Sequence, residues 1–122
     1  MSVSEHDEQC GLVSWFKRTY PEYLIFAIPN GGGRAITEAK RLKIEGVMSG
    51  VFDLQIITNR GMIFFVEMKK IGGKLSKAQK EFAEYLDHVG IGYIVGYGAS
   101  DASEKIMKML DIRQENERQK LI

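Results

Sequence analysis

Two apolar segments on either side of Asn59-Arg60-Gly61 constrain the fold of this chain more than any other feature. Residues 52–58 and 62–68 are short and rich in Ile, Phe and Val, which favour β-strands, and a three-residue link that contains Gly is typical of a hairpin. We therefore predict an antiparallel pair of strands. Counting outward from the turn pairs residue 58 with residue 62 and, further out, Asp53 with Glu67.

This pairing brings two carboxylates together. Side chains alternate between the faces of a strand, so Glu67 and Lys69 share one face, and Asp53 lies opposite Glu67 on that face. Directly opposed residues have Cβ atoms about 5 Å apart, a distance at which two carboxylates repel each other. A hard divalent cation such as Mg²⁺ removes the repulsion, and a lysine beside it can stabilise negative charge on a phosphate. The alternative is a salt-bridged group of these three residues at a solvated edge of the sheet.

The remainder of the chain predicts helices around these strands. Ser4 is a good N-cap for the first helix, and Ser76 with Gln79 forms a capping box for a later one. Short apolar runs at residues 24–28 and 93–97 are typical of buried strands. The apolar spacing predicts helices over residues 4–20, 76–88 and 101–112, with a shorter helix over residues 35–45. The predicted class is α/β, with a central mixed sheet flanked by helices in the order α-β-β-β-α-β-α and the short extra helix after the first strand.

Size and charge are those of a small soluble domain. The 122 residues, of which 44% are apolar, predict one domain with residues 113–122 as a frayed polar tail. No apolar run could span a membrane and the charged N-terminus is no signal peptide, so the expected location is cytoplasmic. Residues 31–80 hold ten Lys/Arg and four Asp/Glu, whereas the rest hold seven and twelve. A basic middle suits contact with a polyanion, although unevenly spread surface lysines explain it equally well.

Beyond the acid pair, the chain resembles the virus-type replication-repair nuclease (VRR-NUC) family, a branch of the PD-(D/E)xK nuclease superfamily. The resemblance runs from about residue 5 to residue 97 and is to the standalone form found in phage and bacteria. One departure is Phe52, where the family usually has Pro. The matching residues are Glu5-x-x-x-Gln9, Trp15, Pro29-Asn30-Gly31-Gly32, Arg34, Glu45-Gly46, Gly50-Val51-Phe52-Asp53-Leu54, Glu67-Met68-Lys69, Gly73-Lys74-Leu75-Ser76-x-x-Gln79 and Gly90-x-x-Tyr93.

The resemblance implies the PD-(D/E)xK core and a role for each residue of the central motif. Asp53 and Glu67 are expected to be ligands of Mg²⁺ or Mn²⁺, with the main-chain carbonyl of Met68 as a further ligand. Lys69 is expected to position or activate the attacking water.

Two further site residues have competing explanations. Glu5, from the first helix, is expected to complete the metal site, with Glu8 as the alternative, and acids are in any case favoured in a first helical turn. The family places Gln79 near the active site, but its role in the capping box explains its presence equally well.

Basic residues around the motif predict contacts with the phosphate backbone. Arg34 follows three glycines, which form a turn that lets it approach a phosphate; the Lys-Ser/Thr of a P-loop is missing, and no organic cofactor is expected. Phosphate contacts are also predicted for Lys70, Lys74, Lys77 and Lys80, with an ordinary solvated helix face as the alternative.

Together these features predict a Mg²⁺- or Mn²⁺-dependent, structure-specific endodeoxyribonuclease. By family resemblance the substrate is branched DNA, above all the Holliday (four-way) junction, cut by a homodimer because two coordinated incisions are needed. The alternatives are a monomeric flap or nicking endonuclease, a nuclease that acts on RNA, and a non-catalytic DNA-binding module on the same fold.

Overall fold

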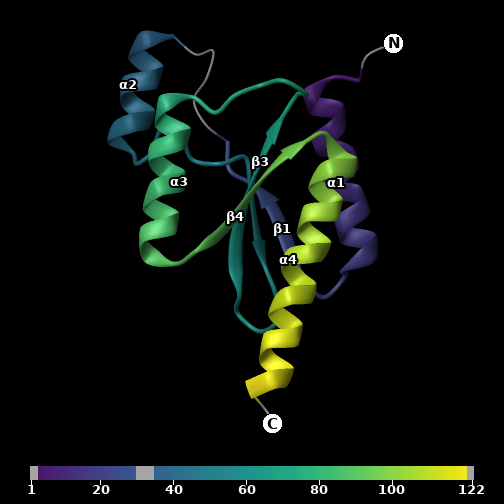
Figure 1. Cartoon of the computed structure of the whole chain (residues 1–122). Helices are drawn as coiled ribbons and strands as arrows, with labels where there is room; N and C mark the ends of the chain where they lie inside the picture. Colours follow the sequence, from purple (N-terminus) through teal and green to yellow (C-terminus); the bar gives the residue numbers. More distant parts are fainter. Residues whose placement is uncertain (1–2, 30–34, 121–122) are drawn as a thin grey trace.

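A computed structural model describes residues 3–29 and 35–120, and of residues 113–118 and 120 it describes the backbone alone. Four strands form one mixed sheet with helices on both faces, which confirms the predicted α/β class (Figure 1). In chain order the elements are α1 (Glu5–Thr19), β1 (Leu24–Ala27), α2 (Ile36–Ile44), β2 (Leu54–Ile57), β3 (Ile63–Lys69), α3 (Lys77–Val89), β4 (Gly92–Tyr97) and α4 (Ala99–Lys120).

The β2–β3 hairpin has the register that the turn predicts. Ile57 pairs with Ile63 and Leu54 with Val66 in an antiparallel ladder. The turn is closed by a 2.9 Å hydrogen bond from the N–H of Thr58 to the carbonyl of Met62. Since β2 begins at Leu54, Asp53 lies one residue before the strand and, in the same register, opposite Glu67.

The connection from β3 to β4 places α3 on one face of the sheet. The two strands are parallel, which requires a crossover, and α3 supplies it. Ser76 and Gln79 form the predicted capping box at its start, and Gly90 ends it with φ of 80°. The strand order β1-β2-β3-β4 therefore leaves β3, the strand that carries Glu67 and Lys69, in the interior of the sheet.

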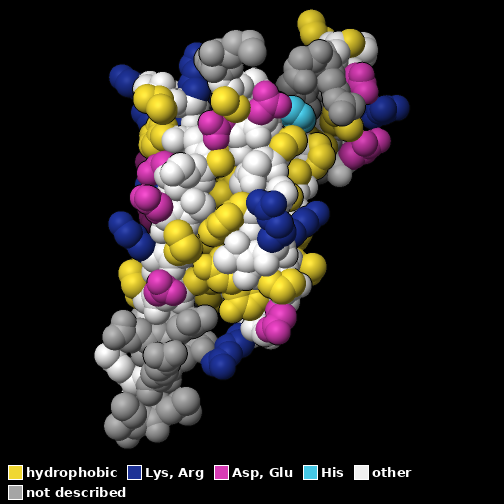
Figure 2. Space-filling view, turned by 90° about the vertical axis from the view of Figure 1, so that its right-hand side faces the viewer, with side chains coloured by type: hydrophobic (Ala, Val, Ile, Leu, Met, Phe, Trp, Pro, Cys, Tyr) yellow, Lys and Arg dark blue, Asp and Glu magenta, His cyan; other side chains and the backbone are white. Residues whose placement is uncertain are grey.

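The main core lies between the sheet and the pair α1 and α4. Leu12 and Phe16 of α1 and Ile106 of α4 are fully buried against the strands. Ser4 caps α1 as predicted, since its Oγ accepts from the N–H of Asp7 at 3.0 Å. Figure 2, which faces this side of the molecule, shows hydrophobic side chains gathered on its surface among scattered charges.

The opposite face is only partly covered, because α3 packs over β3 and β4 but not over β1. Phe52 lies fully buried here, with its ring 5.3 Å from that of Phe82. The strand predicted at residues 24–28 is present as β1, but the prediction that it is buried was wrong: β1 is an edge strand in which only Ile25 is buried, and Leu24 and Phe26 remain exposed. Burial of both faces would require a helix over β1 on this side as well.

The last helix differs most from its predicted limits. We expected residues 101–112, but α4 begins at Ala99 and continues to Lys120. The extension lacks an apolar stripe but is rich in Arg, Gln, Glu and Lys, which are good helix formers. Among the helices of the described segments, none combines the length and the apolar content needed to cross a bilayer.

Candidate active site

Asp53 and Glu67 lie side by side, and each is hydrogen-bonded to the main chain of the opposite strand segment. The N–H of Asp53 donates to Oε1 of Glu67 at 3.1 Å, and the N–H of Met68 donates to Oδ2 of Asp53 at 3.0 Å. These bonds hold the two carboxylates in defined orientations at the point where β2 begins. The structure therefore brings together the pair that the hairpin register predicted.

Burial raises the pKa of Glu67 from 4.5 to about 7, and the nearby carboxylate of Asp53 adds to the rise. Lys69 and the N–H of Asp53 lower this pKa, and Glu5 raises it further, but burial and the Asp53 carboxylate outweigh them. A buried acid beside a second acid is short of positive charge, and an added cation would supply it.

Lys69 lies next to the acid pair at the end of β3. Its Nζ is 3.8 Å from Oε2 of Glu67, and its side chain is 19% exposed, so the ammonium can still reach a ligand. A simple salt bridge at a solvated edge does not describe this arrangement. β3 has a neighbour on each side and Glu67 is only 2% exposed, so the group lies inside the sheet and not at a solvated edge.

Gln79 serves both of the roles that the sequence left open. Its side-chain N–H donates to Oε2 of Glu67 at 2.9 Å, while its side-chain carbonyl accepts from the N–H of Ser76 at 2.9 Å. The capping box that begins α3 thus also orients the Glu67 carboxylate. One residue connects helix formation to the geometry of the site.

The two candidate acids of α1 occupy different environments. Oε2 of Glu8 accepts from the N–H of Ala99 at 2.7 Å, so Glu8 caps the start of α4. The neighbouring Gly98 donates its N–H to the carbonyl of Lys69 at 3.2 Å, which links this cap to the end of β3. Glu5 is exposed at the start of α1, and its charge contributes to the raised pKa of Glu67. The role of Glu5 as a metal ligand stays a prediction.

The donor set fits a cation that needs few protein ligands. Within residues 3–29 and 35–120, no group of three or more His, Cys, Asp and Glu side chains could hold a metal ion, so Glu5 does not join the acid pair in one cluster. Mg²⁺ typically uses one or two carboxylates and takes its other ligands from water and substrate phosphate. The Met68 side chain is buried in the core, so only its main chain could contribute.

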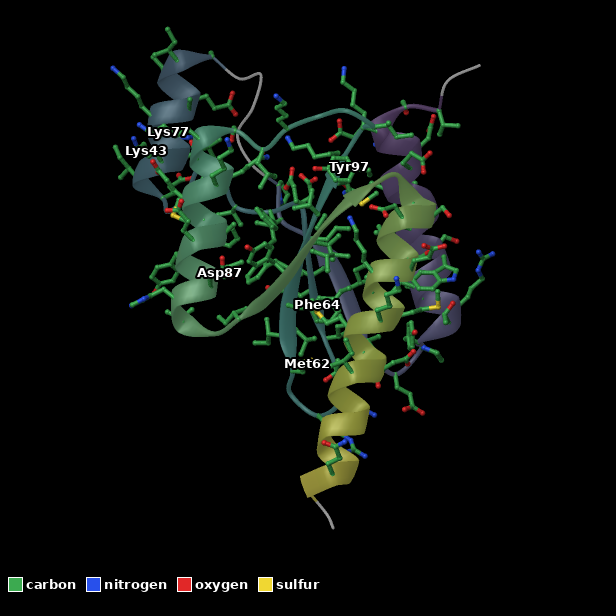
Figure 3. The ribbon with its side chains drawn as sticks, in the orientation of Figure 1. Lys43, Met62, Phe64, Lys77, Asp87 and Tyr97 are labelled. Atoms are coloured by element: carbon green, nitrogen blue, oxygen red, sulfur yellow. The ribbon has the colours of Figure 1, made fainter. Side chains whose placement is uncertain are left out.

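The predicted phosphate contacts fall into separate places. Arg34 lies outside the described residues. Lys70 and Lys74 are exposed in the loop between β3 and α3, and Lys77 and Lys80 are exposed on α3. Figure 3 shows Lys77 on the side of α3 that lies next to α2. Lys43 of α2 and Ala78 of α3 line the same surface hollow. Sequence reasoning missed Lys43, although it belongs to the basic stretch of residues 31–80.

Tyr97 is a second residue that the sequence did not single out. It ends β4 in parallel register with Lys69, and both line a pocket of about 430 Å³. A tyrosine at the end of an apolar strand gives no signal by itself. Its neighbour becomes known only from the parallel pairing of β3 and β4, which is set by packing over the whole sheet.

Comparison with known proteins identifies the architecture. No protein-family model matches the sequence, and no curated protein matches it. A solved structure described as a VRR_NUC domain protein is similar over 88% of each chain, with a TM-score of 0.70 and 25% identity. A second, described as a VRR_NUC domain, has a TM-score of 0.56 and 20% identity over 82% of this chain and 95% of its own; at that identity the likeness shows the fold alone.

Proposed function

Because the chain is a member of the VRR-NUC family of PD-(D/E)xK-like nucleases, we propose that it is a metal-dependent endonuclease that hydrolyses phosphodiester bonds in DNA. One observation carries the proposal: Asp53 and Glu67 are held side by side with the Lys69 ammonium 3.8 Å from Glu67. Two acids that can hold a cation and a lysine beside them suit phosphodiester hydrolysis, since negative charge develops on the phosphate during attack.

Three groups are proposed to bind or orient the cation and its ligands. Asp53 and Glu67 would hold the cation, aided by the main chain of Met68, while Glu5, which does not join the acid pair in one cluster, would add its negative charge from the start of α1. Mg²⁺ or Mn²⁺ in this place supplies a Lewis acid for the phosphate and lowers the pKa of water. Gln79 keeps the Glu67 carboxylate oriented through its 2.9 Å hydrogen bond.

Lys69 acts on the reacting groups themselves. Its ammonium orients the attacking water in line with the scissile phosphate and stabilises the charge that builds up on the phosphate oxygens. Attack of the water oxygen on the phosphorus breaks the P–O3′ bond and leaves a 5′-phosphate and a 3′-hydroxyl. The water gives up a proton to solvent, and the departing O3′ takes one up from solvent. The main chain of Lys69 is held by the hydrogen bond from Gly98, which restricts where the ammonium can reach.

The preferred substrate in this proposal is branched DNA, with four-way junctions first, and the active form is a homodimer. A junction needs two symmetric cuts, and a chain of 122 residues has little surface with which to surround one. The apolar surface over α1 and α4 in Figure 2 supports association with a second copy. Exposed lysines near the site support contact with the DNA backbone.

The test compares labelled four-way junction, flap and linear duplex DNA, each with and without Mg²⁺ or Mn²⁺. Metal-dependent cleavage with the junction preferred is the expected result. Cleavage without any divalent metal, or no cleavage of any substrate, would overturn the enzyme proposal and leave a DNA-binding module. A labelled RNA junction of the same sequence distinguishes DNA from RNA specificity.

Light scattering at micromolar concentration tests the assembly. The proposal predicts the mass of a dimer. A monomer that still cuts flaps or nicks duplex DNA would replace the junction proposal by that of a flap or nicking endonuclease.

A further inference from the structure

A pocket shares Lys69 with the candidate active site. It has a volume of about 430 Å³ and lies between the start of α1, the end of β3 and the start of α4, lined in part by Glu5, Glu8, Lys69, Lys70 and Tyr97. Ligand sites of this size are common in proteins. Lys69 lines this pocket, and its Nζ lies 3.8 Å from Oε2 of Glu67, so the pocket and the acid pair share one ammonium group.

Tyr97 is held in place on this wall. The Nζ of Lys105 lies 5.1 Å from the centroid of the Tyr97 ring. That ammonium is itself fixed by Oδ2 of Asp101 at 2.8 Å and by the carbonyl of Val95 at 2.7 Å. The N–H of Tyr97 also donates to Asp101 at 2.9 Å. Tyr97 nevertheless remains 37% exposed, so part of its side chain is accessible to a ligand. Because these contacts already restrain the side chain, binding would cost little conformational entropy.

The side chains that line the pocket indicate which kind of ligand it would bind. Two ammonium groups, those of Lys69 and Lys70, can contact phosphate, and an aromatic ring offers a surface on which a base of any sequence can stack. The lining also holds two carboxylates: Glu8 accepts from the N–H of Ala99, whereas Glu5 is exposed at the start of α1. The lysines and the acids are therefore equal in number, and the aromatic ring is the feature that distinguishes a nucleotide from a bare phosphate. Lysines and an exposed ring in one pocket are the combination found where single nucleotides are bound.

We propose that this pocket binds the nucleotide next to the scissile phosphate, with its base unstacked from the DNA and placed on the Tyr97 ring. The inference rests on the proposed nuclease function and deepens it. A base inside continuous duplex must first be unstacked at a cost of a few kcal/mol, whereas a base at a branch point or in a single strand is partly free already. Tyr97 would therefore favour branched over continuous DNA.

The test combines a change in the protein with a change in the DNA. Tyr97→Ala should lower kcat/KM on junction DNA by about 5- to 150-fold, the range that loss of one base–aromatic stack produces. Tyr97→Phe, which keeps the aromatic ring, should restore most of the activity that Tyr97→Ala loses. Tyr97→Leu, which keeps apolar bulk without an aromatic ring, should resemble Tyr97→Ala. Tyr85→Ala is the matched control, because Tyr85 is an exposed tyrosine on α3, outside the pocket.

An abasic nucleotide on one side of the mapped cut site should impair the wild type as much as Tyr97→Ala does and should not impair that variant further. Losses that add independently would overturn the inference. A second readout does not need activity: 2-aminopurine at the same position should be quenched on binding by wild type but not by Tyr97→Ala.

These readouts separate the two proposals. If the wild type cuts DNA, but the losses from Tyr97→Ala and from the abasic nucleotide add and 2-aminopurine is not quenched, the nucleotide pocket is overturned and the nuclease function stands. Quenching that depends on Tyr97 in a protein that cuts no DNA overturns the nuclease function and supports the pocket.

Discussion

The main-chain N–H of Asp53 donates a 3.1 Å hydrogen bond to the Glu67 carboxylate, which keeps two mutually repelling acids in contact. The geometry of the hairpin, rather than any attraction between the side chains, therefore brings them together. Burial, together with the nearby Asp53 carboxylate, raises the pKa of Glu67 to about 7. This relationship leads to predictions on stability, metal binding and catalysis.

Without metal, the free energy of unfolding should fall as pH rises from about 4.5 to 7. The pKa of Glu67 is near 4.5 in the unfolded chain and about 7 in the folded one, so in this range the folded state binds the proton more tightly. Above pH 7 the cost of the ionised form is fully present, on the order of 3 kcal/mol. Glu67→Gln removes this charge and should stabilise the protein more at pH 8 than at pH 5.

Thermal unfolding in EDTA measures this difference, with Glu84→Gln on the exposed side of α3 as the control. An equal effect of Glu67→Gln at both pH values would contradict the assigned environment of Glu67.

Mg²⁺ or Mn²⁺ should raise the melting temperature of the wild type, because a ligand that binds only the folded state stabilises it. Asp53→Asn keeps the size of the side chain but removes one negative charge from the pair, so the metal-induced shift should be strongly reduced. Calorimetry on the same two proteins gives the affinities directly. Equal shifts in both proteins would mean that the metal binds elsewhere.

Glu5 and Glu8 should give opposite phenotypes. Glu8→Ala removes the 2.7 Å hydrogen bond to Ala99 and should lower the free energy of unfolding. A loss of about 1.5–3 kcal/mol is typical for a hydrogen bond to a charged group. Glu5→Ala should leave stability within about 0.5 kcal/mol, as expected for an exposed residue, and should weaken metal binding. Urea unfolding and metal titration on both variants check this, and the reverse result would make Glu8 the ligand.

Gln79→Ala should impair activity more than Ser76→Ala does. Both variants disrupt the capping box, which should cost each about 0.5–2 kcal/mol of stability. Only Gln79→Ala also removes the hydrogen bond to Glu67. Activity measured well below the melting temperature of both variants separates the two effects. Matching activity losses would mean that Gln79 acts through the helix alone.

Features that depend on a few neighbouring residues could be predicted from the sequence. The turn at Asn59-Arg60-Gly61 sets the register of its hairpin, so the pairing of Asp53 with Glu67 followed from counting. The capping box of α3 was visible for the same reason, because Ser76 and Gln79 are three residues apart.

Features that depend on distant packing could not be predicted. The exposure of Leu24 and Phe26 depends on β1 being an edge strand with one uncovered face. The hydrogen bond that Glu8 accepts depends on the position of Ala99 at the start of α4, 91 residues further along the chain. The second role of Gln79 appears only once α3 is packed beside β3.

The most direct test of the account is single-turnover cleavage of a labelled four-way junction by wild type and Lys69→Ala in Mg²⁺, with binding measured in parallel. The account predicts that the variant binds the junction nearly as tightly as wild type and cuts it at least about 100-fold more slowly, as when one group that stabilises developing charge is removed. Equal loss of binding and cutting would mean that Lys69 contributes only charge to DNA binding, and undiminished cutting would contradict the assigned active site.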